Sequence, residues 1–461
     1  MRPLRPRPLL DPATSPFRPQ ICVWELTRSC NLRCDHCGSA AGEARAGELS
    51  TSECLDVVEQ LADLGCQLIT LSGGEPTLRN DWEAVARAAV ARGVTVNMVT
   101  NGTTMTDGLA RRIAAAQLAN VAVSLDGPER VHDEVRGEGS FCQAAAGLRA
   151  LADAGVTTAV LTQLNRATAD VLDETHALAV ELGASMWRMQ LAKPMGRLTC
   201  RSTLITPRDL LEVLPRLALI KQRSPIEVAV GDSIGYFGPA DSVLRSRSQE
   251  PRGLRGPWGG CQAGRLAIGI ESDGGVKACL SLQGKSVAGH DPFREGELRR
   301  QRLAEIWYSP ASFAFNRRPV ELTGFCRRCE HAAVCRGGAR CVAAAFGGKL
   351  TEDPYCYHRV ASIQDAAPRL ERLRHYAAAS VLALGIGGLL AGCDNRSVPT
   401  TDGGNDIHSL RKDGRLDGAR DGLPPDGKLA PDTVDPCAGY CSCPACDYGV
   451  WPPECYGKPC N

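Results

Sequence analysis

The sequence lacks an excess of charge of either sign, because its 461 residues include 53 Lys and Arg against 52 Asp and Glu. No surplus of cations is available to replace the counterions of a nucleic acid, so nucleic acid is not expected as the main partner. Glycine and proline, with 48 and 29 residues, stay below the share that marks a low-complexity chain. The length and the 43% of hydrophobic residues allow two or three domains with buried cores.

The first twenty residues lack an apolar run and hold six Pro and four Arg. Such a segment offers nothing to bury, and it predicts an extended, disordered leader over residues 1–20. Because no secretory signal is found there, we expect a cytoplasmic, reducing location for the folded part of the chain. Clustered thiols in that setting favour metal or redox chemistry over disulfides.

Cysteine is abundant, with 22 residues, and most of them are clustered. Three lie within residues 30–37, seven between Cys261 and Cys356, and six between Cys437 and Cys460, while Cys393 ends an apolar run. A lone cysteine usually behaves as a small buried hydrophobe. This is what we expect of the five scattered ones, Cys22, Cys54, Cys66, Cys142 and Cys200.

Short apolar runs alternate with helical patterns from residue 21 to residue 191. The expected strands are Ile21–Thr27, Gln67–Leu71, Thr95–Thr100, Asn120–Leu125, Val156–Leu164 and Ser185–Leu191. The first helix between them starts at a capping box of Ser50 and Glu53 and stops at Gly65. Six strands separated by helices predict an α/β fold, a partial (β/α)6 TIM-like barrel over residues 21–200.

The chain beyond the barrel divides by composition. Residues 201–260 are expected to form a connection, made of a helix that begins at Thr206-Pro207 and a Gly- and Ser-rich loop. A small cysteine-rich domain with a β-hairpin at 265–280 follows over 261–360. We expect a helix with an apolar segment over 361–393, a flexible linker over 394–436 and a cysteine-rich tail over 437–461. The C-terminal part is therefore predicted to be largely disordered.

Cys30, Cys34 and Cys37 follow the first expected strand directly. In a parallel barrel, active sites assemble at that end of the strands. Three closely spaced thiolates can hold three irons of a [4Fe–4S] cube and leave the fourth iron free. Zinc is the alternative, although tetrahedral zinc would require a fourth ligand.

Three further motifs stand at the ends of the next strands. They are Gly73-Gly74-Glu75-Pro76, Thr100-Asn101-Gly102 and Ser124-Leu125-Asp126-Gly127. Together with Cys-x3-Cys-x2-Cys after the first strand, these four strand ends in this order resemble the radical S-adenosylmethionine (SAM) superfamily. The resemblance covers about residues 21–191.

The resemblance implies roles for the motif residues. The free iron of the cluster on Cys30, Cys34 and Cys37 would chelate the methionine part of SAM. Gly73, Gly74 and Glu75 would meet its amino group, His36 would lie against the adenine, and Asn101, Ser124 and Asp126 would contact the ribose or carboxylate. One electron from the cluster would then cleave the sulfonium to a 5′-deoxyadenosyl radical, which takes a hydrogen atom from the substrate.

The second cysteine group resembles the SPASM extension of radical SAM enzymes. Its pattern is Cys261, Cys279, then Cys326-x2-Cys329-x5-Cys335-x5-Cys341, and finally Cys356. The resemblance implies one auxiliary [4Fe–4S] cluster on Cys326, Cys329, Cys335 and Cys356, and a second on Cys261, Cys279 and Cys341. The five-residue gap before Cys341 is usually three, and no Cys lies between 201 and 260 to complete the second cluster. That cluster therefore has a non-Cys ligand, has an open iron, or is absent, and a zinc ribbon is the alternative for the whole region.

The resemblance implies a peptide substrate, because SPASM enzymes mostly modify ribosomally made peptides, and a one-electron reductant such as flavodoxin or ferredoxin. Some members modify tetrapyrroles instead, which is the alternative enzyme function. A rival of another class is a membrane-tethered iron–sulfur electron carrier, and a structural zinc protein ranks below it. Arg197, after the sixth strand, is a candidate for a substrate or cofactor carboxylate or else a surface residue.

Ala377–Ala391 is an uncharged run of fifteen residues before Cys393. As a helix it would span about 22 Å, short of the roughly 30 Å hydrocarbon core of a bilayer. The sequence Leu390-Ala391-Gly392-Cys393 resembles a lipoprotein lipobox. We keep three interpretations: a buried helix, a membrane tether through 377–393, or a fusion with a lipoprotein-like precursor. The six tail cysteines would form disulfides if exported, or bind metal or serve as the substrate if cytosolic.

Overall fold

The computed structural model describes residues 15–198, 201–231, 233–246, 258–283 and 291–364. The described residues up to Ile363 belong to one unit, and the second unit, Gln364–Ala438, lies outside them apart from Gln364. Most of the expected leader, the apolar segment 377–393, the linker and the cysteine-rich tail also lie outside the described residues. The interpretations of those segments, and the domain boundaries, stay predictions.

Ten strands form one sheet in the order β10-β9-β8-β1-β2-β3-β4-β5-β6-β7. Neighbouring strands from β8 through β1 to β7 are parallel, and β9 and β10 are antiparallel. Strands β10 and β7 are the two edges, so the curved sheet does not close, which confirms the partial barrel. The bounds are β1 Ile21–Thr27, β2 Leu68–Gly73, β3 Thr95–Thr100, β4 Asn120–Ser124, β5 Thr158–Leu164, β6 Met186–Leu191, β7 Glu227–Val230, β8 Ala267–Ile270, β9 Gly275–Lys277 and β10 Arg294–Glu297.

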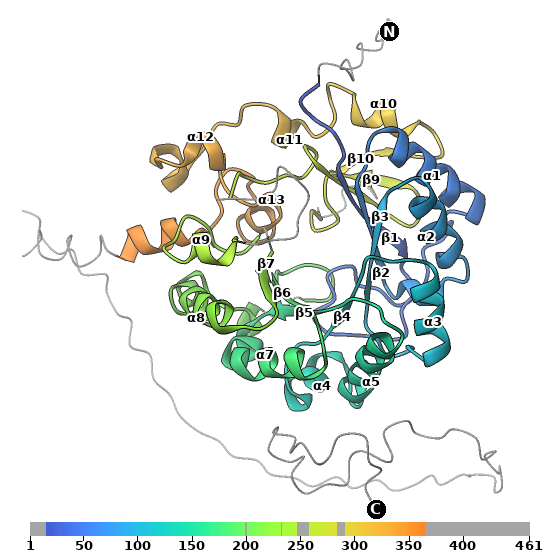
Figure 1. Cartoon of the computed structure of the whole chain (residues 1–461). Coiled ribbons are helices and arrows are strands. Elements are labelled where there is room, and N and C mark those ends of the chain that lie inside the picture. The colour runs from blue at the N-terminus through green and yellow to red at the C-terminus, as the bar shows by residue number, and fades with distance from the viewer. Residues whose placement is uncertain (1–14, 199–200, 232, 247–257, 284–290, 365–461) are drawn as a thin grey trace, which may run out of the picture. The chain divides into compact units, whose positions relative to one another are not determined.

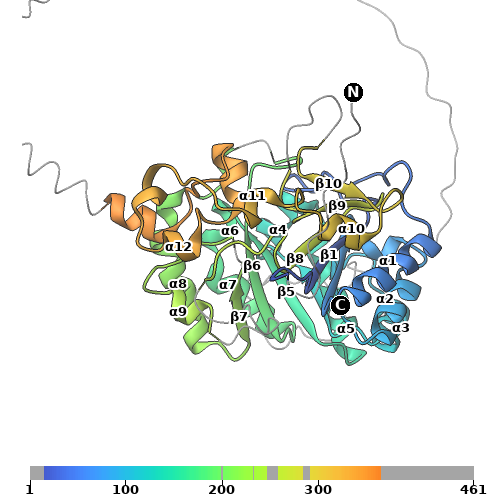
Figure 2. The same ribbon diagram turned by 90° about the horizontal axis from the view of Figure 1, so that it is seen from above.

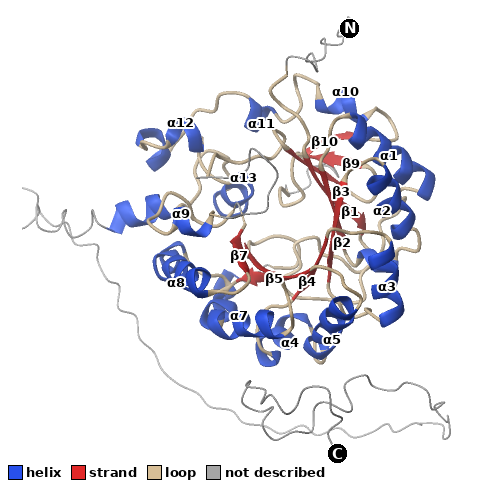
Figure 3. Ribbon diagram, in the orientation of Figure 1, coloured by secondary structure: helices blue, strands red, loops and turns tan. Residues whose placement is uncertain are grey.

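The helices of the barrel lie on the outer side of the strands, as Figure 3 shows. Alternate strand residues point toward them, so Trp24 and Leu26 of β1 share an apolar core with Val58 and Leu61 of α1. The bounds are α1 Thr51–Asp63, α2 Trp82–Ala91, α3 Asp107–Ala115, α4 Glu129–Arg136, α5 Ser140–Asp153, α6 Arg166–Asp170, α7 Leu172–Glu181, α8 Leu210–Arg223 and α9 Asp241–Leu244.

Local signals set the helix ends where the sequence predicts them. The Ser50 hydroxyl accepts a hydrogen bond from Glu53 N at 3.3 Å, and the Glu53 carboxylate accepts one from Ser50 N at 2.7 Å, which confirms the capping box of α1. Gly65 follows the helix with φ of +81°, a conformation that a side chain disfavours. All six expected strands are present, with ends that differ from the prediction by no more than two residues.

Four strands add to the six that were expected in the barrel sheet. Strand β7 lies in the segment interpreted as a connecting helix and loop, and it adds a seventh parallel strand beside β6. The expected hairpin at 265–280 exists as β8 and β9, but β8 pairs in parallel with β1, so the hairpin extends the sheet on its other side, and β10 pairs with β9. Strands β7 and β10 have four residues each, which is too few for a clear alternation signal.

The cysteine-rich region continues from the hairpin through short elements. Figure 2 shows β9, β10 and α10–α12 gathered at one end of the barrel strands. Their bounds are α10 Leu303–Trp307, α11 Ala314–Arg317, α12 Ala332–Cys335 and α13 Arg340–Val342. In the part of the chain that the structure describes, no helix has the length and apolar character needed to span a bilayer.

Candidate active site

The three cysteines of the first group lie on one loop after β1, which we call the cluster loop (residues 28–42). Backbone hydrogen bonds from Cys30 N to Gly42 O (2.9 Å) and from Gly42 N to Arg28 O (3.1 Å) join its two ends. Cys30, Cys34 and Cys37 all carry free thiols. The Cys37 sulfur lies 3.4 Å from both Ala41 N and the Ser39 hydroxyl, so polar groups already surround this sulfur.

The end of β2 packs directly against the cluster loop. Gly74 N donates to Thr27 O at 2.8 Å, and Glu75 N donates to Ser29 O at 2.7 Å. A Cβ atom on Gly73 would lie 2.1 Å from Thr27 O, and one on Gly74 would lie 2.1 Å from Ser29 O. Both glycines are therefore required for the approach of the two backbones, whatever contact they make with a cofactor.

Glu75 is fully buried and joins the ends of β2 and β3. Its carboxylate accepts hydrogen bonds from the Thr77 hydroxyl at 2.6 Å, the Thr100 hydroxyl at 2.9 Å and Asn101 N at 2.8 Å. Burial raises the pKa of Glu75, and these hydrogen bonds, which lower the pKa, offset that rise only in part. The Asn101 amide in turn donates to Asn31 of the cluster loop at 2.9 Å, and it lies 3.9 Å from the Cys30 sulfur.

Asp126 and His36 form a buried pair beyond the end of β4. The Asp126 carboxylate lies 3.4 Å from His36 Nε2, and it accepts hydrogen bonds from Gln163 N at 2.8 Å and Arg136 Nε at 2.6 Å. Burial alone would raise the pKa of Asp126, but Arg136, His36 and His132 bring it to about 2. Burial lowers the pKa of His36 to about 4. The neutral ring then directs Nε2–H to Asp126, and its buried Nδ1, which has no hydrogen-bond partner among the described residues, is left as an acceptor.

Arg136 is a site residue that the sequence analysis missed. Its guanidinium pairs with Asp126 and lies close enough to Cys34 to lower the pKa of that thiol against the effect of burial, which raises it. Helix α4 reaches the cluster loop through a backbone bond from Asp35 N to Val135 O at 3.1 Å. Nothing in the local sequence separates this arginine from a surface residue of an amphipathic helix, so only the fold reveals it.

Arg197 has a different role from either of the two expected. Its guanidinium donates to Cys34 O at 2.8 Å and to Ala41 O at 2.5 Å, and its backbone N donates to Cys37 O at 3.0 Å. A Cβ atom on the preceding Gly196 would lie 2.3 Å from Cys37 O. In the structure the side chain thus holds the cluster loop against the segment after β6, which a surface residue would not do, and its binding of a carboxylate stays a prediction.

The spacing of the three thiols is compatible with an iron–sulfur cube. Thiolates around a tetrahedral zinc ion lie about 3.8 Å apart, because Zn–S bonds are roughly 2.3 Å long. Within the described ranges, only Glu330, His331 and His358 have three ligand atoms within 4.8 Å of one another. At least one pair of the cluster-loop sulfurs therefore lies farther apart than 4.8 Å, a spacing that a cube accommodates without rearrangement more readily than a single zinc ion does.

Four cysteines of the second group surround one void. Cys326, Cys329, Cys335 and Cys356 line one small pocket together with Phe237, Phe325 and Asp353. Burial raises the pKa of Cys335 to about 12 and that of Cys326 to about 11, so thiolates there require a positively charged metal centre. The structure thus brings together the four residues that the resemblance assigns to one auxiliary cluster.

Cys261, Cys279 and Cys341 form a separate group. Burial raises the pKa of Cys341 to about 12, and the neighbouring Cys279 and Cys261 add to that effect. Of the described cysteines outside these groups, Cys22, Cys54 and Cys142 lie on strands and helices of the barrel, and Cys66 lies in the loop between α1 and β2. The charged side chain that acts most strongly on Cys341 is Lys193. It is buried on the segment after β6, and it lowers the pKa of Cys341 against the effect of burial. That segment therefore contacts the cluster loop through Arg197 and places Lys193 near enough to Cys341 to affect its pKa.

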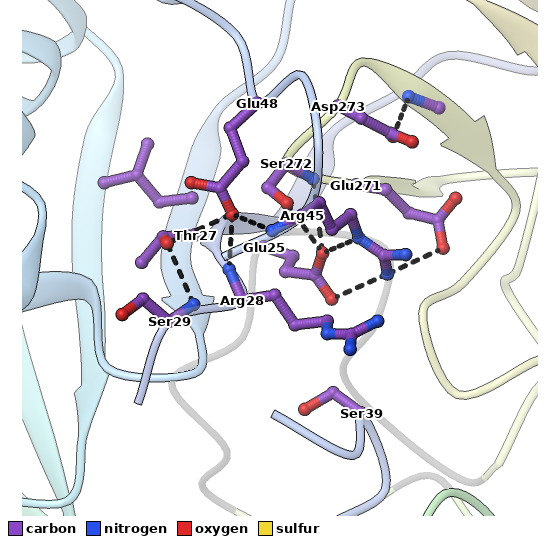
Figure 4. Close-up of polar contacts among 12 residues, drawn as sticks. Glu25, Thr27, Arg28, Ser29, Ser39, Arg45, Glu48, Glu271, Ser272 and Asp273 are labelled. Carbon is purple, nitrogen blue, oxygen red and sulfur yellow. Dashed lines mark hydrogen bonds and ion pairs between the residues drawn. The ribbon is translucent and has the colours of Figure 1, made fainter. Parts of the chain in front are cut away.

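A polar network joins the barrel to the auxiliary region, as Figure 4 shows. Arg45, just past the cluster loop, donates to the buried Glu25 of β1 at 2.7 Å and to Glu271 after β8 at 3.3 Å. Ser272 also donates to Glu25, through its hydroxyl at 3.1 Å. The auxiliary region is thus attached at the same end of β1 that carries the cluster loop.

Comparisons with known proteins agree with this arrangement. The radical SAM superfamily model matches residues 24–179, and the iron–sulfur cluster-binding SPASM model matches residues 261–330, ending before Cys335. The AdoMet-dependent heme synthase of Methanosarcina barkeri is 31% identical over 352 residues, which are 74% of this chain and 97% of that protein. The mycofactocin maturase MftC of Mycolicibacterium smegmatis is 34% identical over 362 residues, 77% of this chain and 86% of that protein.

The chain belongs to the radical SAM superfamily. This radical SAM enzyme also carries the SPASM iron–sulfur domain, and its cofactors are [4Fe–4S] clusters and S-adenosylmethionine. Solved structures share the fold. SuiB of Streptococcus suis bound to the precursor peptide SuiA has a TM-score of 0.60 at 16% identity over 73% of this chain and 75% of that one. The enzyme anSMEcpe with bound AdoMet has a TM-score of 0.57 at 16% identity over 77% of this chain and 99% of that one.

Proposed function

We propose that this radical SAM enzyme modifies a peptide. The observation that carries the proposal is the 34% identity with a maturase across both cysteine-bearing regions. It is supported by the shared fold of SuiB, whose solved structure holds a precursor peptide. A flavodoxin or ferredoxin is the proposed one-electron reductant, because reduction of a low-potential cluster requires such a carrier.

The cluster loop supplies the first cofactor site. Cys30, Cys34 and Cys37 hold the cluster, with hydrogen-bond donors from Ala41 N and Asn101 near two of the sulfurs. When bound, the cluster and SAM supply one-electron chemistry that removes a hydrogen atom from the substrate. Arg136 is a buried cation beside this site, and a planar guanidinium suits the carboxylate of a methionine moiety.

The strand ends supply the SAM contacts. Gly73, Gly74 and Glu75 are proposed at the amino group, with Asn101, Ser124 and Asp126 toward the ribose or carboxylate and His36 at the adenine. Glu75, Asp126 and His36 are each buried and hydrogen-bonded or paired within the protein, so they hold the site in shape before the cofactor binds. The free Nδ1 of His36 matches an adenine amino donor.

The auxiliary sites are proposed to bind one cluster on Cys326, Cys329, Cys335 and Cys356 and a second on Cys261, Cys279 and Cys341. The second group offers three thiols, so its cluster would keep an open iron or take a ligand of another kind. Because the segment after β6 contacts both this group and the cluster loop, a substrate lying along it would meet both sites.

A tetrapyrrole is the second candidate substrate, since a heme synthase is 31% identical over 97% of its length. The two candidate substrates are distinguished by the source of the hydrogen atom that ends up in 5′-deoxyadenosine. The organism that encodes the enzyme is grown with deuterated leucine, valine and tyrosine, or with deuterated 5-aminolevulinate, which labels tetrapyrroles. Each extract is incubated anaerobically with the reconstituted enzyme, SAM and dithionite. Deuterium in 5′-deoxyadenosine from the first extract alone supports a peptide; transfer from the second, or from neither, contradicts the proposal.

The chain itself contains a candidate peptide, the cysteine-rich tail over residues 437–461. This tail lies outside the described residues. Its sequence makes it a candidate, because it is a short segment with six cysteines carried by a peptide-modifying enzyme. The masses of the tail peptides are compared before and after anaerobic turnover with SAM and reductant. Unchanged masses at every tail peptide would exclude the tail as the substrate and leave a separate peptide.

A further inference from the structure

Two histidines and a glutamate meet on the outer side of the four-cysteine void. Nε2 of His358 lies 3.7 Å from Oε1 of Glu330, and one ligand atom from each of Glu330, His331 and His358 lies within 4.8 Å of the other two. The residues come from two segments that are 27 positions apart in the chain. We call this group the His-His-Glu group.

Aromatic packing holds both imidazoles in place. Phe237 stacks on His331 with ring centres 4.1 Å apart, and Phe325 contacts the edge of His358 at 5.6 Å. The two imidazoles meet edge to face at 4.8 Å. Phe237 and Phe325 also line the four-cysteine void, so this layer of rings separates the His-His-Glu group from the proposed auxiliary cluster.

The chemistry of the three side chains suits a divalent transition metal. Two neutral imidazoles and one carboxylate are the ligand set of many non-haem iron and zinc sites, and they leave positions open for water. Bonds of about 2.1 Å place neighbouring ligand atoms roughly 3–3.6 Å apart. Because all three ligand atoms already lie within 4.8 Å of one another, they would need to approach by no more than about 1–2 Å, and the Glu330 side chain is 74% exposed.

We propose that Glu330, His331 and His358 bind a first-row divalent cation and so tie together the two segments that carry the auxiliary cysteines. Glu330 and His331 directly follow Cys329, and His358 lies two residues after Cys356. An ion bound outside the ring layer would thus connect the same two segments that the cluster connects inside it. The inference is independent of whether the substrate is a peptide.

The test is a titration of the untagged full chain with Mn²⁺. The clusters are kept in their oxidised, diamagnetic state, and free Mn²⁺ is measured by its electron paramagnetic resonance signal. The wild type is expected to bind one more Mn²⁺ per chain than the H331Q/H358Q variant. E330Q is expected to weaken that site roughly tenfold or more, because ligand changes cost at least as much as changes in the groups around them. The same Mn²⁺ is expected to slow the loss of cluster iron to an Fe²⁺-selective chelator in the wild type but not in H331Q/H358Q.

Two controls keep the result unambiguous. E321Q removes an exposed carboxylate from the same segment and is expected to bind Mn²⁺ like the wild type. If the double variant retains less iron than the wild type, the comparison is made with the single variants H358Q and E330Q at matched iron content. Equal stoichiometry and affinity in the wild type and the ligand variants would overturn the proposal, as would an equal loss in E321Q.

Discussion

At the scale of single residues, charge in a low-dielectric interior decides what the site can do. Asp126 remains ionised when buried because the Arg136 guanidinium pairs with it at 2.6 Å, whereas burial keeps His36 and His132 neutral. The result is a buried set of groups with defined donors and acceptors beside the cluster loop. Two substitutions test this account without touching the cysteines.

His132 predicts a pH dependence of stability. It accepts a hydrogen bond from Asp126 N through Nδ1 at 3.1 Å, and burial lowers its pKa from 6.5 to about 3. Because the pKa of His132 is lower in the folded state than in the unfolded chain, its neutral form stabilises the fold. That contribution is fully present above pH 6.5 and is lost as the pH falls toward 3. Between pH 7 and pH 5 the loss from this residue is about 2 kcal/mol.

The variant H132N retains an acceptor near the Nδ1 position but has no proton to gain. Urea unfolding of the reconstituted enzyme at pH 7 and pH 5 is therefore expected to show a smaller loss for H132N, by about 2 kcal/mol. A loss equal to that of the wild type would mean that His132 is already charged, or exposed, in the folded state.

Lys193 predicts a shift in a reduction potential. It is a buried cation next to Cys341, and the described structure gives it no carboxylate partner. K193Q removes a charge that stabilises the reduced, more negative cluster. The midpoint potential of one auxiliary cluster is expected to fall by about 50–100 mV, from a Coulomb energy of roughly 2 kcal/mol at an effective dielectric constant of 20. K193R, which keeps the charge, is the control in the same redox titration.

At the scale of elements, the ends of β1, β2 and β6 are built to contact one another through the cluster loop. Gly74, Gly196 and Arg197 each serve this purpose, two by having no side chain and one by donating to loop carbonyls. Close backbone packing therefore matters more here than at the other end of the barrel.

Gly74→Ala tests this packing. Its Cβ would lie 2.1 Å from Ser29 O, so the strand end and the cluster loop must separate. We expect a loss of about 3 kcal/mol in unfolding free energy, together with less iron per chain. Gly108→Ala in α3 is the matched control, because the added Cβ meets nothing closer than 3.8 Å and a helical alanine stabilises by about 0.5–1 kcal/mol. Equal behaviour of the two variants would contradict the account.

At the scale of the described chain, the auxiliary region is attached to the barrel through a shared sheet and several polar contacts, among them the network of Arg45 and the ion pair of Arg299 with Glu53. Strand β8 continues the barrel sheet past β1, and Arg45 links Glu25 of the barrel with Glu271 of the auxiliary hairpin. The two cluster-bearing regions are therefore expected to unfold together.

Arg45→Ala tests this coupling. It leaves Glu25, whose side chain is 5% exposed, as a buried charge without its partner. The expected loss is about 3 kcal/mol, and E25Q/R45A should recover part of it because no unpaired carboxylate remains. Unfolding is followed by barrel circular dichroism and by auxiliary-cluster absorbance. If the two signals separate already in the wild type, the regions are not coupled as proposed.

Much of the barrel was predictable because its signals are local. Each long strand is an apolar run with turn residues at its end, and the box of Ser50 and Glu53 marks the start of α1 within four residues. The spacing of Cys30, Cys34 and Cys37 likewise belongs to one loop. Strands β7 and β10, by contrast, are too short for a periodic signal, and the pairing of the predicted hairpin strand β8 with β1 joins segments that are far apart in the chain.

The sequence by itself determined the order of strands and helices and the cysteine groups, because hydrophobic spacing, caps and thiol spacing act within a few residues of the chain. Only the tertiary structure decided that Arg136 faces Cys34, that Arg197 holds the cluster loop, and that Lys193 lies beside Cys341. Each of these contacts joins residues far apart in the chain, and its strength comes from the exclusion of water by the packed core. A sequence pattern within one segment does not show which charged side chain from a distant part of the chain the fold places next to it.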